Sequence, residues 1–213
     1  MDVSGYIMTK LCKFTLVLYF IALYSCGQNH SYSKVDVNVA RLSNKIIPLV
    51  NFLDNPDSCK KALLFLDSAT AIDNGCFLCY YNKLMFLYSL KEYGKAVETL
   101  NECIRLNPSA QDLYLTGGIL YERVGDTVSA KKYFGKSLTI CNNVLDTMSA
   151  KNRDFDMLVG NKAINLIMLG DEVEANKILK TLYGMQQDEE MKKMILSVMN
   201  KTKKELIEQF TDD

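Results

Sequence analysis

A stretch of 34 residues, from Phe77 to Ala110, has the pattern of two amphipathic helices joined by a tight turn. From Tyr80 onwards apolar residues recur at i, i+4 and i+7, which places them on one face of a first helix. A second apolar stripe begins at Ala96, and Pro108 follows its end, where a helix usually stops. Because two helices approach closely only where a side chain is small, Ala96 predicts a close crossing of the pair.

The same pattern returns on both sides of this unit, which indicates an internal repeat. Ala62 and Ala130 stand 34 residues before and after Ala96, whereas Ala175 stands 45 residues after Ala130. The longer interval predicts an insertion of eleven residues that extends the second helix of the third copy and ends in a short loop. The chain then divides into copies 43–76, 77–110, 111–144 and 156–189, with the insertion at 145–155.

Two Gly-Asp pairs, Gly125-Asp126 and Gly170-Asp171, occupy matching positions between the two helices of their copies. Glycine allows the open backbone conformation with which helices often end, and aspartate is a preferred first cap of the next helix. The turn residues therefore agree with the helical periods on either side of them.

The unit 77–110 resembles the tetratricopeptide repeat at Tyr80, Leu84, Leu87, Tyr93, Ala96, Leu100, Cys103 and Pro108. The resemblance extends over about 43–189, and it implies an all-α fold, a right-handed α-solenoid of about four helix pairs. A solenoid needs its last face covered, and apolar residues such as Met191, Ile195 and Leu206 follow a helical stripe in 190–213. We therefore expect a C-terminal capping helix there; the alternative is a helix that binds a partner or a membrane surface.

The composition narrows the class of protein further. The chain has 213 residues, of which 48% are hydrophobic, and 25 basic side chains balance 25 acidic ones. Only three prolines and eleven glycines interrupt it, which favours an all-α fold. A neutral chain without a basic stripe argues against nucleic acid as a partner.

The N-terminus has the layout of a secretory signal, with two lysines before the apolar run 14–24. Leu23-Tyr24-Ser25-Cys26 resembles a bacterial lipobox, which implies that Cys26 is lipidated and becomes the first mature residue. We expect a signal peptide at 1–25, a lipidated cysteine and polar tether at 26–42, and a lipid-anchored protein of the bacterial cell envelope, at the outer membrane or a periplasmic face. An uncleaved anchor and an ordinary cleaved signal are the alternatives, and translation begins at Met1 or at Met8.

Residues for catalysis are scarce. The one histidine, His30, lies in the tether, and neither a glycine-rich phosphate loop nor a nucleophile elbow is present. We expect no catalytic residue, no cofactor and no metal site. Cys76 and Cys79 form a CxxC pair at a predicted helix start, where the pKa of a thiol is lowered, so a thiol-disulfide redox protein is an alternative function. The βαβ setting of a thioredoxin-like motif is missing.

The family resemblance implies that the first helices of successive copies line a concave groove. A peptide or a partner helix is the expected ligand, and the other possibility is that these side chains only contact neighbouring copies. The sequence thus favours a non-enzymatic interaction scaffold with an unidentified protein partner and no small-molecule substrate; a structural spacer without a specific ligand is a further alternative. The groove does not resemble a carboxylate clamp. Its predicted residues are Leu78, Tyr81, Met85, Tyr88, Asp112, Leu115, Ile119, Glu122, Arg123, Ile164, Ile167 and Met168.

Overall fold

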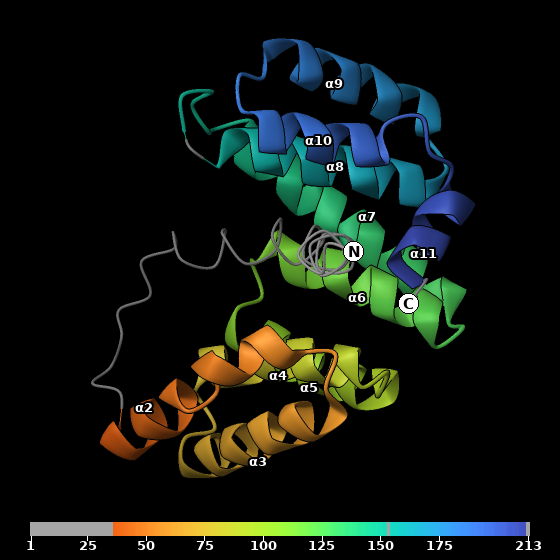
Figure 1. The fold of residues 1–213 in the computed structure, drawn as a ribbon. Helices are drawn as coiled ribbons and strands as arrows, with labels where there is room; N and C mark the ends of the chain where they lie inside the picture. The colour runs from red at the N-terminus through yellow and green to blue at the C-terminus, as the bar shows by residue number, and fades with distance from the viewer. Residues whose placement is uncertain (1–35, 153, 212–213) are drawn as a thin grey trace, which may run out of the picture. The chain divides into compact units, whose positions relative to one another are not determined.

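The computed structural model describes residues 36–152 and 154–211, and every regular element in these ranges is a helix (Figure 1). The expected signal peptide, Cys26 and the first ten residues of the expected tether lie outside the described residues. The all-α fold of consecutive helix pairs is confirmed. The elements are α2 (Val37–Asn44), the 3-10 helix η1 (Ile47–Phe52), α3 (Pro56–Ile72), α4 (Phe77–Ser89), α5 (Tyr93–Leu106), α6 (Gln111–Arg123), α7 (Thr127–Leu145), α8 (Phe155–Leu169), α9 (Glu172–Met185), α10 (Glu189–Val198) and α11 (Lys203–Thr211).

The chain divides at residue 110 into two compact units, and each unit has its own hydrophobic core. The N-terminal unit contains α2 to α5. Its first copy differs from the expected boundaries, because α2 begins at Val37, where the Asp36 carboxylate accepts a hydrogen bond from the Asn38 N–H at 2.7 Å. The expected tether therefore ends before residue 37 rather than at 42. Pro48 is the second residue of η1, so the helical stretch at the start of this copy is split into α2 and η1.

The C-terminal unit contains α6 to α11. Its turns confirm the predicted chemistry: Gly125 and Gly170 have φ of 81° and 94°, and the next residue caps a helix in each case. The Asp126 carboxylate accepts from the Ser129 N–H at 3.0 Å, and that of Asp171 accepts from the Glu174 N–H at 3.2 Å. These caps satisfy backbone donors that have no partner inside the helix.

Close helix crossings occur at the aligned alanines in both units. Ala62, Ala96, Ala130 and Ala175 are all 0% exposed. The crossing of α6 and α7 has a second small residue, Gly118, which lies directly against the ring of Phe134. After this crossing α7 continues to Leu145, and a loop leads to α8.

The C-terminal stretch is not the single capping helix that the sequence predicts. It forms α10, which packs against α9, and α11, which packs against α6 and α8. The break lies at Asn200, whose φ of 63° is left-handed and whose N–H donates to the Asn176 side chain at 2.6 Å. A new helix then starts from a capping box, because the Thr202 hydroxyl accepts from the Glu205 N–H while the Glu205 carboxylate accepts from the Thr202 N–H.

Candidate partner-binding faces

Four of the predicted groove residues lie on α4 in the N-terminal unit, and we call Leu78, Tyr81, Met85 and Tyr88 the α4 face. Leu78 is 44% exposed, and the other three side chains are half-buried. Tyr81 packs on Phe77 with ring centroids 5.7 Å apart. Met85 packs against the N-terminal core. The α4 face therefore keeps apolar and aromatic surface in contact with solvent.

The remaining predicted groove residues lie in the C-terminal unit, and most of them do not face solvent. Five of them, Leu115, Ile119, Ile164, Ile167 and Met168, belong to its hydrophobic core and are at most 6% exposed. Asp112 is 2% exposed. These side chains are covered in the structure, because residues of α9, α10 and α11 belong to the same apolar cluster, and their role in binding a partner stays a prediction.

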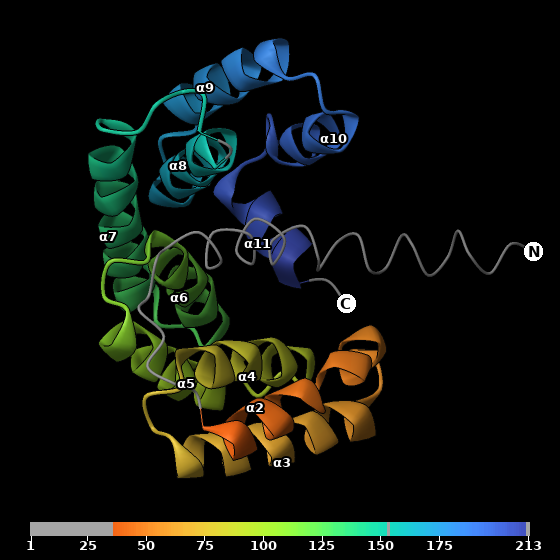
Figure 2. The same cartoon turned by 90° about the vertical axis from the view of Figure 1, so that its left-hand side faces the viewer.

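Helix α11 covers the surface made by α6 and α8, which we call the α11 cradle. In Figure 2, α7 and α11 lie on opposite sides of α6. Leu206 of α11 is 0% exposed and belongs to the cluster that contains Ile119 and Met168, and Ile207 packs against the same cluster. The chain's own C-terminal helix thus occupies a surface that the sequence assigned to a ligand.

Two carboxylates hold the first turn of α11. Lys203 Nζ lies 2.6 Å from Glu122 Oε1, and the Glu122 side chain is only 8% exposed. The backbone N–H of Lys203 donates to Glu172 Oε1 of α9 at 3.1 Å. Negative charge at a helix N-terminus is favourable, because the backbone N–H groups there carry partial positive charge. Glu122 was predicted as a groove residue, and Arg123 beside it is half-buried.

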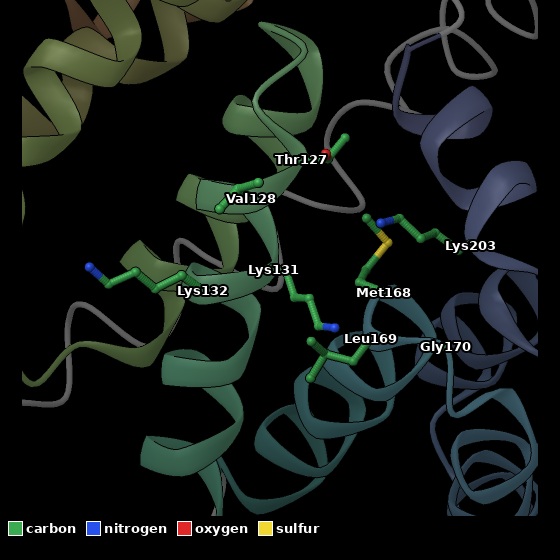
Figure 3. A pocket seen from close by; sticks show the side chains of 8 residues that line it. All are labelled: Thr127, Val128, Lys131, Lys132, Met168, Leu169, Gly170 and Lys203. Carbon is green, nitrogen blue, oxygen red and sulfur yellow. The ribbon is translucent and has the colours of Figure 1, made fainter.

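A depression of about 640 Å³ opens beside the first turn of α11 (Figure 3). Met168 of α8, which is 2% exposed, and Lys203 of α11, whose side chain is 36% exposed, line it. Two further lysines, Lys131 and Lys132, come from α7. Solvent therefore reaches the first turn of α11 at Lys203.

The CxxC pair forms a disulfide between Cys76 and Cys79 at the start of α4. Cys79 is 0% exposed, whereas Cys76 is half-buried. Burial raises the pKa of the Cys141 thiol to about 12 and, less strongly, that of Cys59, so these thiols stay protonated near neutral pH. Thiol exchange at the disulfide would have to begin at Cys76.

The described residues contain neither a metal-binding cluster nor a membrane-spanning helix. Within 36–211, apart from 153, no group of three or more His, Cys, Asp or Glu side chains is arranged to hold a metal ion. No helix in the same ranges is long and apolar enough to cross a membrane.

Sequence reasoning missed a buried polar network that joins α6, α7 and α8. Asn165 Nδ2 donates to Ser137 Oγ at 2.9 Å, and Ser137 Oγ donates to the Gln111 carbonyl at 2.9 Å. All three side chains are at most 1% exposed. The signal was present as an asparagine within the otherwise apolar run from Ala163 to Leu169. The network links the two helices of the α11 cradle through α7.

Comparisons with known proteins agree with the repeat pattern. The family model described as "Tetratricopeptide repeat" matches residues 78–109. A TPR repeat-containing protein of Methanocaldococcus jannaschii is 31% identical over 121 residues, which are 57% of this chain and 19% of that protein. The chain thus spans about a fifth of the length of this relative.

Two solved structures superpose on much of the chain at low identity. The crystal structure of MamA has 18% identity and a TM-score of 0.49, covering 86% of this chain and 94% of that one. A tetratricopeptide repeat protein from Parabacteroides merdae has 16% identity and a TM-score of 0.43, covering 97% and 96%. With TM-scores below 0.5, these likenesses add nothing to the family assignment. The family model shows a tetratricopeptide repeat at residues 78–109 of this chain, and the repeat-containing relative and the helix pairs with their buried alanines agree with further copies of it.

Proposed function

We propose that this protein is a non-enzymatic interaction scaffold that a lipid on Cys26 anchors to a membrane of the bacterial cell envelope and that binds a peptide or a partner helix. Proteins built from tetratricopeptide repeats generally mediate protein–protein interaction. The membrane anchor is supported by the lipobox-like sequence at 23–26.

The observation that carries the proposal is the α4 face. Aromatic side chains and methionine are enriched at the centres of protein interfaces, because they bury much apolar area and adapt to a partner's shape. Tyr81 and Tyr88 keep part of their rings exposed while Phe77 and Tyr93 support them, with ring centroids 5.7 and 5.4 Å apart. Supported aromatic rings of this kind are suited to hold a peptide or a helix.

The test is a crosslinking pull-down from native membranes with the parent and a Leu78→Glu/Tyr81→Glu variant. Met85 is left unchanged because it packs against the N-terminal core. A matched control replaces Val37 and Val173, which are 80% and 85% exposed, by glutamate. We expect one envelope protein to be captured by the parent and the control and to be lost from the variant. Identical capture by all three would refute binding at the α4 face and place the partner on another surface, whereas no specific capture by any of them would favour a spacer.

A second candidate, thiol-disulfide exchange, is favoured by the disulfide between Cys76 and Cys79 and by the partial exposure of Cys76. Replacing both cysteines with serine separates the two functions. A scaffold keeps its partner in this variant, whereas a redox protein loses disulfide exchange with a model dithiol. The folded fraction of the variant, measured by circular dichroism, excludes loss of structure as the cause.

A further inference from the structure

We infer that α11 is a replaceable occupant of the α11 cradle, and that a lysine-bearing amphipathic helix of a partner protein binds the same surface in its place. The inference rests on the proposed scaffold function and specifies the class of partner. It concerns the C-terminal unit alone, where α11 packs on α6 and α8 and shares an apolar cluster with five of the predicted groove residues.

The cradle is built to receive a helix. It combines an apolar cluster, which includes Ile119 and Met168, with the carboxylate of Glu122, which is nearly buried. A nearly buried carboxylate is costly without a cation beside it, and Lys203 Nζ supplies that cation at 2.6 Å. An empty cradle would expose both the apolar cluster and this charge.

Helix α11 is short, and only one of its sides is buried. Leu206 is the one residue of 203–209 that is fully buried, while Lys204, Glu205 and Glu208 are exposed. Nine residues are fewer than the roughly 12 to 15 that an isolated helix needs to be even marginally stable in water. The short non-helical segment after α10, centred on the left-handed Asn200, gives α11 a natural hinge.

The contacts of α11 define the chemistry of its replacement. A lysine in the first turn meets Glu122, and apolar residues three and four positions later, at Leu206 and Ile207, meet the cluster. These spacings lie on one face of a helix. A partner helix therefore carries a lysine or an arginine one turn before two apolar residues, and an acidic residue in place of the lysine is rejected by Glu122.

The test uses the full chain and a fluorescent peptide with the sequence of residues 201–213, followed by anisotropy. In the parent, α11 competes with the peptide from within the chain. Leu206→Asp places a charge at a fully buried position and releases α11. We expect this variant to bind the peptide at least about 10-fold more tightly than the parent, because affinity falls with the fraction of vacant sites. The matched control is Leu196→Asp on α10, where the leucine is 50% exposed, and it binds as the parent does.

Charge reversal checks that the peptide binds the α11 cradle and not another surface. A peptide with glutamate at the position of Lys203 loses binding to Leu206→Asp, and adding Glu122→Lys to that protein restores binding of this peptide. If Leu206→Asp fails to fold by circular dichroism, Lys203→Glu replaces it, since this change disrupts the ion pair and leaves Leu206 in place.

Three outcomes overturn the inference: equal affinity of parent and variant, no binding to a folded variant, or a dimer of the variant in light scattering, which would make a second copy the occupant. A failure here is distinguishable from failure of the scaffold function, because the peptide titration needs no natural partner. Capture of an envelope protein through the α4 face can persist when the peptide fails to bind.

Discussion

Gly118 permits the close crossing of α6 and α7, and replacing it by alanine tests the packing of the C-terminal unit. A Cβ at this position would lie 2.5 Å from Cδ1 and 2.6 Å from Cζ of Phe134. Phe134 is 0% exposed, so its ring cannot swing into solvent. The ring or the helix has to move instead.

The net effect is a balance of two opposing terms. Overpacking a core costs about 1 to 3 kcal/mol, and contacts this short place Gly118→Ala near the upper end of that range. Alanine in a helix interior gains about 1 kcal/mol over glycine. We expect Gly118→Ala to destabilise the protein by about 2 kcal/mol, the difference between these terms.

Gly135 offers the matched control, because it lies in α7 and a Cβ there meets no atom within 4 Å. Gly135→Ala has no overpacking cost and keeps the higher helix propensity of alanine, so it stabilises the protein by about 0.5 to 1 kcal/mol. Urea denaturation followed by circular dichroism gives both changes as shifts of the midpoint. If Gly118→Ala proves as stable as Gly135→Ala, the helices do not cross as closely as described.

Two further changes probe the same core. Ala130→Arg introduces a long charged side chain at a helix crossing where the alanine is 0% exposed. Ordinary overpacking costs about 1 to 3 kcal/mol, and we expect this change to lower the free energy of unfolding by more than that. An unchanged thermal melt would contradict the repeat register. Burial raises the pKa of Cys141 from 9.0 to about 12, so the unfolded chain loses a proton that the folded one keeps, and stability falls as pH rises between these values. Burial also raises the pKa of Tyr133 to about 12, so Cys141→Ala should reduce this alkaline loss in urea titrations without abolishing it, and an equally steep loss would show that Cys141 does not contribute.

Local signals were enough to predict the helix pairs. A small residue at a crossing and a glycine before an aspartate act through their immediate neighbours, so their positions in the sequence predict their positions in the fold. Ala96 is fully buried, and Gly125 has a positive φ, as their patterns required. The start of α2 was missed because Asp36, which caps it, lies in a polar run that resembles a tether.

The partner-binding faces were less predictable, because an apolar stripe on a helix does not show which neighbouring helices it packs against. Leu206 continues the stripe of α10, yet Asn200 redirects the chain so that Leu206 reaches α6 and α8. The signal for this break was the capping box Thr202-Lys-Lys-Glu205, which starts a new helix inside an apparently continuous one. Ile119 is buried by residues distant in the sequence, such as Leu206, so the sequence around Ile119 does not predict its burial.

The most direct test of the scaffold function is photocrosslinking in cells from two single positions. A benzoylphenylalanine at Tyr81 lies on the α4 face, and one at Val173 lies at a position that is 85% exposed, outside the proposed binding faces. We expect one discrete adduct with an envelope protein from Tyr81 and none from Val173. No adduct from Tyr81, or the same adducts from both positions, would contradict a partner bound at the α4 face.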